Sequence, residues 1–189
     1  MNEIEKELED IKKLLELYNE GEDIDEESFL SYLNSGEEEY FKIETKFTNV
    51  SNNPDPEYAK EGDSGFDLRA FIEEPITLKP LERKLIPTGL RVELPKNTEL
   101  QVRPRSGMAI RHGISVLNTP GTVDEGYRGE IGIIAINLSY EEYTIQPGER
   151  IAQGVITHVI GEGISKLIKV VELNETERGE TGFGSSGKN

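Results

Sequence analysis

The chain has 189 residues, a net charge of −16 at pH 7 and no cysteine. This length suits one domain with a substantial hydrophobic core and some additional chain. The lack of cysteine excludes a disulfide framework and thiolate metal sites, and it fits a reducing compartment.

The negative charge is concentrated in residues 1–40, which contain fifteen of the 37 acidic and three of the 21 basic residues. This segment therefore carries −12, and the rest of the chain carries −4. No basic stripe is available to hold a nucleic-acid backbone. No apolar run approaches the ~18 residues of a membrane span, and the N-terminus lacks the pattern of a secretory signal. We expect a cytoplasmic protein that binds neither nucleic acid nor membranes.

Residues 1–40 show the spacing of amphipathic helices. Apolar side chains recur in steps of four and three at Ile4, Leu8, Ile11, Leu15 and Tyr18. This stripe predicts one helix, and a second short helix is expected from about residue 25 to 34. We interpret residues 1–40 as an acidic helical extension docked on its own domain. The alternative is an arm that binds a protein partner.

From Phe41 onward the pattern changes to short strands separated by proline and glycine. Phe41–Phe47 alternates in steps of two. Further strands are expected at 67–71, 76–78, 84–93, 99–103, 114–117, 131–138, 143–145, 151–160 and 166–173. This pattern predicts an all-β sandwich or barrel, and no strong helix pattern follows residue 60.

The stretch from Asn118 to Ile133 lies between two of the expected strands and contains the turn signals Pro120-Gly121 and Gly126. It predicts a strand, a tight hairpin-like excursion and a returning strand. Asp124 and Tyr127 lie three residues apart on this excursion. They are either ordinary turn residues or an acid and an aromatic ring directed at one small ligand.

Four other segments carry groups suited to an anionic nucleotide. They are Asp63–Ala70 with Asp67 beside a glycine turn, Arg103–Ala109 with guanidinium, hydroxyl and backbone donors, Gly148–Gln153 with an amide, and the glycine-rich 178–189 with Arg178 and Phe183. Glycine-rich backbone and arginine bind phosphates, and an aromatic ring stacks on a base.

In order and spacing, the five segments resemble the signature motifs of the homotrimeric dUTPases (deoxyuridine triphosphate nucleotidohydrolases). The resemblance covers roughly residues 41–189. It implies a jelly-roll-like β domain at 41–176, a glycine-rich lid at 177–189 and a trimer with active sites at subunit interfaces. Residues 1–40 lie outside it. The implied reaction is Mg²⁺-assisted hydrolysis of dUTP to dUMP and pyrophosphate, which keeps uracil out of DNA and supplies dUMP for thymidylate synthesis.

The resemblance also implies a role for each motif residue. Asp124 is the expected general base, and Tyr127 is expected to pack beneath the deoxyribose. The uracil edge is assigned to Asn118, Gly121, Thr122 and Val123. The phosphates are assigned to Arg105, Ser106, Gly107 and Gln153. The lid residues are Arg178, Gly184, Ser185 and Ser186, with Phe183 stacking on uracil. Asp67 is expected to hold water molecules of a Mg²⁺ ion that the triphosphate binds directly.

Other polar residues receive structural interpretations. Arg103 is expected in a salt bridge or a subunit contact, and Arg128 and Glu130 as an exposed or interface pair. His112 and His158 are not expected to be catalytic.

Three alternatives remain. The dCTP deaminases share the fold but are expected to carry a glutamate on the strand after the central turn, and Ile131–Asn137 contains no acid. A nucleotide-sensing protein would signal through residues 1–40. A plain β-sandwich binding module would require all five motifs to be coincidental.

Overall fold

A computed structural model describes residues 44–161 and 165–179. The two helices expected within residues 1–40 therefore lie outside the described residues. So do the first residues of the strand predicted from Phe41, which is described from Lys46 as β1 (Lys46–Asn49).

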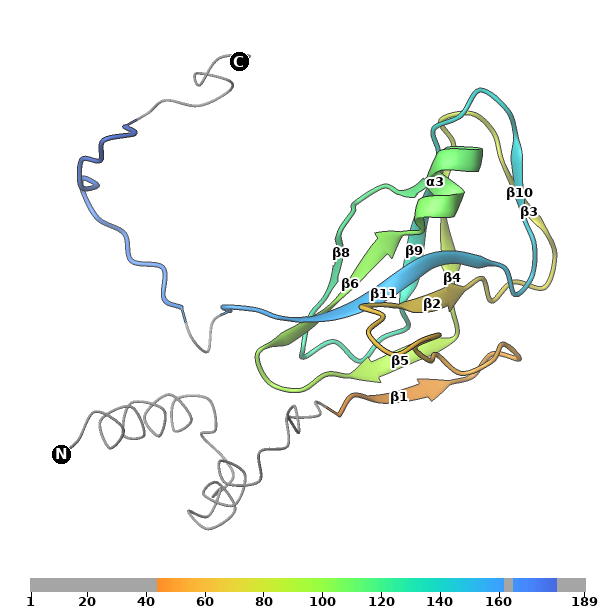
Figure 1. Cartoon of the computed structure of the whole chain (residues 1–189), viewed down its shortest axis with the longest axis horizontal. Helices are drawn as coiled ribbons and strands as arrows, with labels where there is room; N and C mark the ends of the chain where they lie inside the picture. The colour runs from red at the N-terminus through yellow and green to blue at the C-terminus, as the bar shows by residue number, and fades with distance from the viewer. Residues whose placement is uncertain (1–43, 162–164, 180–189) are drawn as a thin grey trace, which may run out of the picture. The chain divides into compact units, whose positions relative to one another are not determined.

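Short strands are the main regular elements of the described chain, as the sequence predicted (Figure 1). After β1 they are β2 (Phe66–Arg69), β3 (Ile76–Leu78), β4 (Arg83–Pro87), β5 (Leu90–Glu93), β6 (Thr98–Pro104), β7 (Ile114–Val116), β8 (Gly121–Val123), β9 (Gly132–Asn137), β10 (Tyr143–Ile145) and β11 (Arg150–His158). One helix, α3 (Ser106–His112), interrupts them. No described helix has the length and apolar character needed to cross a membrane.

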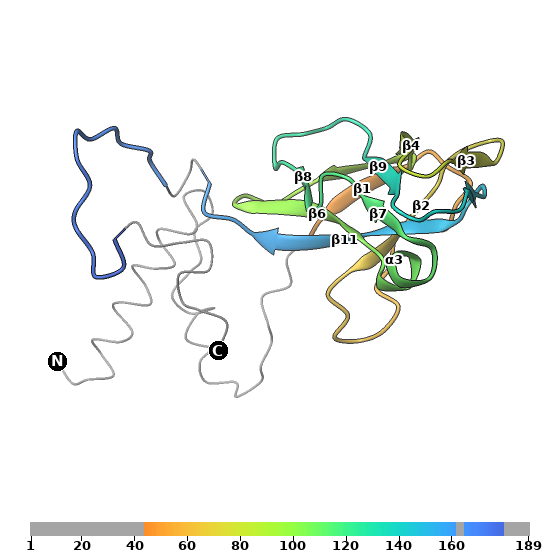
Figure 2. The ribbon, with the colours of Figure 1, turned by 90° about the horizontal axis from the view of Figure 1, so that it is seen from above.

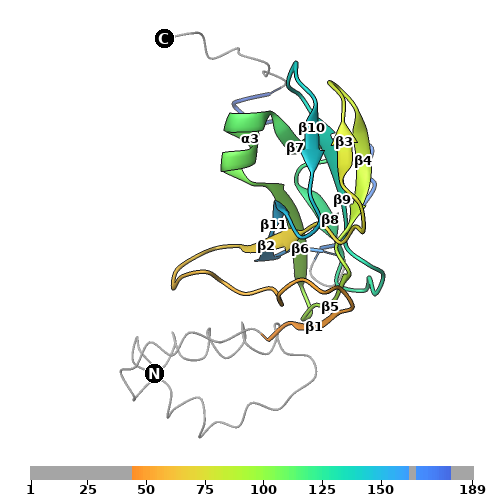
Figure 3. The same ribbon diagram turned by 90° about the vertical axis from the view of Figure 1, so that its right-hand side faces the viewer.

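The strands form two main sheets and two ribbons, all with antiparallel pairing. The larger sheet has the order β2-β11-β6-β8 and the smaller one β4-β9-β7, while β1-β5 and β10-β3 form the ribbons. Figures 2 and 3 both place β2 and β11 on one side of the domain and β4 and β9 on the other. Apolar side chains of both sheets join one buried cluster, as expected for a sandwich.

Alternating side chains explain how the strands face this core. In β6, Thr98, Leu100 and Val102 are buried while the residues between them are partly exposed. Successive side chains of a strand point to opposite faces, so one face of β6 packs inward and the other supports polar groups.

The single strand expected at 84–93 is two strands, β4 and β5. Gly89 has φ 72°, and a Cβ atom there would lie only 2.7 Å from the Cβ of Ser51. Thr88 is buried and donates its hydroxyl hydrogen to the carbonyl of Ile131 at 2.6 Å. Before this break β4 pairs with β9, and after it β5 pairs with β1. The alternation of residues in the sequence does not indicate this change of partner.

The sequence shows no strong helix pattern after residue 60, yet α3 occupies Ser106–His112. Seven residues are too few to produce a clear helical period. The helix depends instead on burial of Met108 and on Gly113, whose left-handed conformation (φ 66°) ends it with a hydrogen bond to Ala109.

The strand expected at 166–173 is also absent from the structure. Residues 165–179 are exposed and contain only a bend and a turn. Apolar and β-branched residues favour a strand, but a strand requires a neighbour to accept its hydrogen bonds.

The central excursion is longer and more structured than the expected tight hairpin. Its flanking strands do pair, with Val116 opposite Ala135 in β7 and β9. Between them, however, β8 crosses to the other sheet, where Gly121 lies opposite Val102 of β6. The stretch thus connects both sheets.

A buried asparagine fixes the end of β9. Asn137 is fully buried, and its amide donates to the carbonyls of Leu78 at 2.9 Å and Glu141 at 2.7 Å. Its side-chain oxygen accepts the backbone N–H of Ser139 at 2.9 Å. This one side chain joins β3, β9 and the turn leading to β10.

We expect Asn137→Ala to lower the free energy of unfolding by about 3 kcal/mol, because several buried partners lose their hydrogen bonds. Asn52, an exposed loop residue, provides the control, and Asn52→Ala should stay within about 0.5 kcal/mol of the unsubstituted protein. Urea unfolding at one fixed protein concentration compares the three proteins. Equal stabilities for the two variants would contradict this role of Asn137.

Candidate functional site

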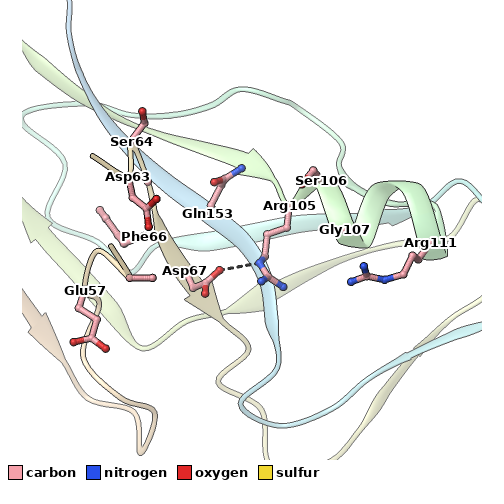
Figure 4. A pocket seen from close by; sticks show the side chains of 12 residues that line it. Glu57, Asp63, Ser64, Phe66, Asp67, Arg105, Ser106, Gly107, Arg111 and Gln153 are labelled. Atoms are coloured by element: carbon pink, nitrogen blue, oxygen red, sulfur yellow. Dashed lines mark ion pairs between the residues drawn. The ribbon is translucent and has the colours of Figure 1, made fainter. Parts of the chain in front are cut away.

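A cavity of about 330 Å³ lies beside the beginning of α3 (Figure 4). It is bounded by residues 57–67, by the first turn of α3 and by β11. Five residues that the sequence analysis predicted line it together: Asp67, Arg105, Ser106, Gly107 and Gln153. Three separate motifs therefore meet in one cavity.

An ion-pair cluster occupies one wall of this cavity. The Nε atom of Arg105 lies 2.8 Å from Oδ1 of Asp67, and Nη1 of Arg150 lies 3.1 Å from Oδ2. Arg105 also donates from Nη1 to the carbonyl of Arg150 at 3.0 Å. Both oxygens of Asp67 thus face guanidinium groups, and Arg105 is held in place before any ligand binds.

Strand register positions the amide of Gln153. In β11 this residue lies opposite Asp67 of β2 and opposite Arg103 of β6. Its Nε2 donates to the carbonyl of Pro104 at 2.9 Å. The amide is therefore fixed at the junction between β6 and α3.

The first turn of α3 supplies the backbone of the predicted phosphate site. Ser106 and Gly107 occupy the first two helical positions, where backbone N–H groups have no acceptor within the helix. Both residues line the same cavity as Arg105, where backbone N–H donors suit the oxygens of an anion.

Tyr143 supports the opposite side of α3. Its ring lies 4.9 Å from that of His112, and its hydroxyl contacts the sulfur of Met108 and donates a hydrogen bond to Glu149. Burial, followed by the hydrogen bond to Glu149, raises the pKa of Tyr143 above its usual value. His112 is exposed and packs its ring on that of Tyr143, and its non-catalytic interpretation stays a prediction.

The second group of predicted residues lies on the excursion between β8 and β9. Asp124 is exposed, and its carboxylate has no hydrogen bond or ion pair among the described residues. Its backbone carbonyl accepts the N–H of Tyr127 at 3.0 Å, so the turn uses the main chain of Asp124 and leaves its side chain available.

Two other carboxylates anchor this excursion. Glu125 accepts the backbone N–H of Asn97 at 2.8 Å. Glu130 accepts those of Thr88 and Gly89 at 3.1 and 2.8 Å. Asp124 therefore lies on a segment that is hydrogen-bonded on both sides to turns between β4 and β6.

A glycine makes room for the aromatic ring on this excursion. Tyr127 is 46% exposed, and its hydroxyl donates to the carbonyl of Glu130 at 3.0 Å. A Cβ atom on Gly129 would lie 2.2 Å from the hydroxyl oxygen of Tyr127. Any side chain at Gly129 would displace the tyrosine. The sequence analysis did not assign this role to Gly129, because the close approach is visible only in three dimensions.

Asn118 lies beside the start of β8. A Cβ atom on Gly121 would lie 3.2 Å from the amide nitrogen of Asn118. The structure thus brings this predicted pair together, with Thr122 exposed and Val123 buried in the same short strand.

The two groups of predicted residues lie at opposite ends of β6. Asp124 follows Val123, which pairs with Leu100, whereas Arg105 follows Pro104 beyond the far end of the strand. At about 3.3 Å per residue, the chain from Leu100 to Arg105 spans roughly 17 Å. Within one chain, the acid and the arginine cannot both contact the same phosphate.

The predicted lid is only partly described. Arg178 is exposed in a turn at residues 177–179. The other predicted lid residues lie outside the described residues: Phe183, Gly184, Ser185 and Ser186.

Arg103, Arg128 and Glu130 make different contacts within one chain from those that a salt bridge or a direct pair would give. Arg128 and Glu130 are both exposed, as expected, but Arg128 donates to the carbonyl of Glu125 at 2.6 Å and Glu130 binds the backbone beyond β4. Arg103 donates from Nε to the side chain of Gln101 at 2.9 Å, and its subunit contact stays a prediction.

The cavity lining contains residues that the sequence analysis did not assign. Glu57, Asp63 and Arg111 line it, and Arg150 pairs with Asp67 at its edge. Arg111 follows Gly107 by four residues, so recognition of α3 was needed to place both on one face.

The donors of the cavity suit a hard cation that takes most of its ligands from phosphate and water. Asp67 brings a carboxylate next to Arg105. Among the described residues, no group of three or more histidine, cysteine, aspartate or glutamate side chains is arranged to hold a metal ion by itself. Mg²⁺ commonly binds through one or two carboxylates together with substrate phosphates, and the residues present fit that mode.

Comparisons with known proteins point to one family. A family model described as dUTPase matches residues 51–187. The deoxyuridine 5'-triphosphate nucleotidohydrolase of Clostridium novyi is 61% identical over 132 residues, which cover 70% of this chain and 89% of that protein. The protein of the same name from Fusobacterium nucleatum is 54% identical over 147 residues, covering 78% and 99%.

A solved structure of the Staphylococcus bacteriophage 80alpha dUTPase with dUpNHpp superposes with a TM-score of 0.69 at 27% identity. The match covers 78% of this chain and 100% of that one. The all-β architecture is accordingly the jelly-roll-like fold expected from the sequence.

The support of α3 by Tyr143 can be tested. We expect Tyr143→Phe to lower the free energy of unfolding by about 1 kcal/mol at pH 7, because Glu149 loses a hydrogen-bond donor. Because the pKa of Tyr143 is raised in the folded state, its protonated side chain stabilises the fold at pH values below the pKa of the unfolded tyrosine. This contribution is lost as the pH rises above about 10 toward the folded pKa.

The stability difference between the unsubstituted protein and Tyr143→Phe should therefore shrink above pH 10. Urea unfolding from pH 7 to pH 11 measures it. Tyr140 is fully exposed, and Tyr140→Phe is the matched control. A difference that grows with pH would contradict the assigned cause.

Proposed function

We propose that this chain, which belongs to the dUTPase family, hydrolyses dUTP to dUMP and pyrophosphate. The observation that carries the proposal is the meeting of Arg105, Gln153 and the first turn of α3 in one cavity. Guanidinium, amide and backbone N–H donors together suit the oxygens of a polyphosphate.

The active site is proposed to form between copies of the chain. Asp124 follows Val123, which pairs with Leu100, and roughly 17 Å of strand separate Leu100 from Arg105, so a complete site requires the excursion of a second copy. Apolar side chains on the β4-β9-β7 sheet and its edges support association: Leu85, Leu117 and Leu138 are 67%, 47% and 57% exposed. A homotrimer, with active sites at subunit interfaces, is the assembly proposed.

Asp124 is assigned as the general base. Attack of water on the α-phosphorus requires a carboxylate that orients the water and accepts its proton. The carboxylate of Asp124 is exposed and makes no hydrogen bond or ion pair within the described ranges, and the anchors at Glu125 and Glu130 hold its backbone. Arg105, Ser106, Gly107 and Gln153 bind and orient the phosphate oxygens.

Mg²⁺ is the proposed cofactor. When bound, it would neutralise charge on the phosphate oxygens and hold the triphosphate in one geometry. Asp67 is the residue proposed to hold its water ligands, since its carboxylate lines the phosphate cavity.

Substrate selection is assigned to the excursion and the lid. Asn118 and the backbone of Gly121, Thr122 and Val123 would hydrogen-bond the uracil edge, so that the wrong base leaves polar groups unpaired. Tyr127 would pack beneath the deoxyribose and exclude a 2′-hydroxyl. In the lid, Arg178, Gly184, Ser185 and Ser186 would bind the terminal phosphates while Phe183 stacks on uracil.

The proposed cellular role is removal of dUTP before it enters DNA, together with supply of dUMP for thymidylate synthesis. The cytoplasm remains the proposed compartment, in keeping with the absence of cysteine. Residues 1–40 lie before the family match at 51–187, and a protein partner for them stays a prediction.

We expect Asp124→Asn to lower kcat for dUTP by about a thousandfold, because the amide cannot accept the proton of the attacking water. Pyrophosphate release from dUTP, dCTP, dTTP and UTP in the presence of Mg²⁺ measures both activity and specificity. Only dUTP should be turned over efficiently.

The matched control is Glu142→Gln, which neutralises an exposed acid in the turn before β10 and should leave kcat unchanged within twofold. Binding of dUTP without pyrophosphate release from the unsubstituted protein would favour a nucleotide sensor. Release of ammonia from dCTP would favour the deaminase alternative.

Removal of divalent metal should lower dUTP turnover at least a hundredfold, since charge on the phosphates is no longer neutralised. Titration with EDTA followed by added Mg²⁺ measures the loss and the recovery. The melting temperature of the protein without nucleotide should not change, because the triphosphate supplies most of the metal ligands. Full turnover in EDTA would contradict the proposed cofactor.

A further inference from the structure

Arg111 is a second guanidinium in the phosphate cavity. It belongs to the last turn of α3, yet it lines the same cavity as Ser106 and Gly107 in the first turn. Side chains of a helix lean toward its N-terminus, and residues four apart lie on one face. Figure 4 shows Arg111 extending from α3 on the side where Arg105 lies.

The guanidinium of Arg111 covers the backbone of Gly107. A Cβ atom on Gly107 would lie 2.7 Å from Nη2 and 3.2 Å from Cζ of Arg111. Glycine at this position therefore leaves the space that the guanidinium occupies. Any larger residue would push the charge of Arg111 away from the first turn of α3.

The two arginines of the cavity differ in what they bind. Arg105 is engaged by Asp67 at 2.8 Å and by the carbonyl of Arg150 at 3.0 Å. Arg111 makes no hydrogen bond or ion pair to any residue in the described part of the chain. Its N–H groups are thus open to a ligand, whereas Nε of Arg105 is already paired.

The charge balance of the cavity makes this second cation important. Its lining includes the carboxylates of Glu57, Asp63 and Asp67 and only two guanidinium groups, those of Arg105 and Arg111. Without Arg111, the remaining arginine would already be paired with a carboxylate. The lining already has one more carboxylate than guanidinium groups, and without Arg111 this excess of negative charge facing a polyphosphate would rise to two.

We propose that Arg111 is a further phosphate-binding residue, which contacts the polyphosphate chain from above Gly107. The inference rests on the proposed function for its substrate, dUTP. The planar fork of the guanidinium can donate two hydrogen bonds to one phosphate group, and lysine cannot reproduce that geometry. Arg111 thereby supplies positive charge that Asp67 does not neutralise.

The test compares Arg111→Gln with Arg111→Lys and with a matched control. Arg91→Gln removes the same charge from an exposed position on β5, outside the cavity lining. We expect Arg111→Gln to raise KM for dUTP about tenfold while kcat falls less than twofold. The KM of Arg111→Lys should lie between those of Arg111→Gln and the unsubstituted protein. The KM of Arg91→Gln should match that of the unsubstituted protein.

Binding measurements separate a phosphate contact from a structural effect. By calorimetry, Arg111→Gln should weaken binding of inorganic tripolyphosphate and of the α,β-imido analogue of dUTP about tenfold. Binding of dUMP should change less than twofold. If Arg111→Gln lowers the melting temperature, Arg111→Met, which keeps the aliphatic stem, replaces it in the same series.

Three results would overturn the inference: unchanged tripolyphosphate binding, equal losses in Arg111→Gln and Arg91→Gln, or equal losses for dUMP and tripolyphosphate. Failure of the proposed function gives a different pattern. In that case the unsubstituted protein would not hydrolyse dUTP, while its binding of tripolyphosphate would still depend on Arg111.

Discussion

The position of β11 between β2 and β6 is the constraint on which the candidate site depends. This strand pairs along most of its length with β6, and near its start it also pairs with β2. Gln153 is thereby placed opposite Asp67 on one side and Arg103 on the other. A shift of one residue would turn Gln153 to the other face of the sheet and separate it from Asp67 and Arg105. The antiparallel ladder, a backbone feature, therefore determines which side chains meet in the cavity.

The charges of the cavity are arranged so that its acids and arginines restrain one another. Asp67 binds both Arg105 and Arg150, which holds the guanidinium of Arg105 in the absence of a ligand. This preorganisation lowers the conformational cost of binding, but it also means that a phosphate shares Arg105 with a carboxylate. The position of Arg111 above Gly107 provides a cation that is not shared in this way.

The larger sheet also separates Asp124 from the residues that line the cavity. Asp124 follows β8 near Leu100, while Arg105 begins beyond the opposite end of β6. The excursion that carries Asp124 and Tyr127 is nonetheless firmly held, because Glu125 and Glu130 bind backbone N–H groups of neighbouring turns. The anchored excursion therefore carries its exposed acid at a distance from the cavity of the same chain.

The sequence by itself determined the strand-rich class, the positions of most strands and five of the residues that line the cavity, because alternation and short motifs are local properties of the chain. Only the tertiary structure decided where strands change partners. The break at Gly89, the crossing of β8 to β6 and the absence of a strand at 166–173 depend on neighbours distant in sequence. The same holds for α3, which depends on the burial of Met108, and for Arg111, whose place in the cavity follows from that helix. Local pattern specifies which face of a segment is apolar, whereas packing between distant segments selects the surface that it meets.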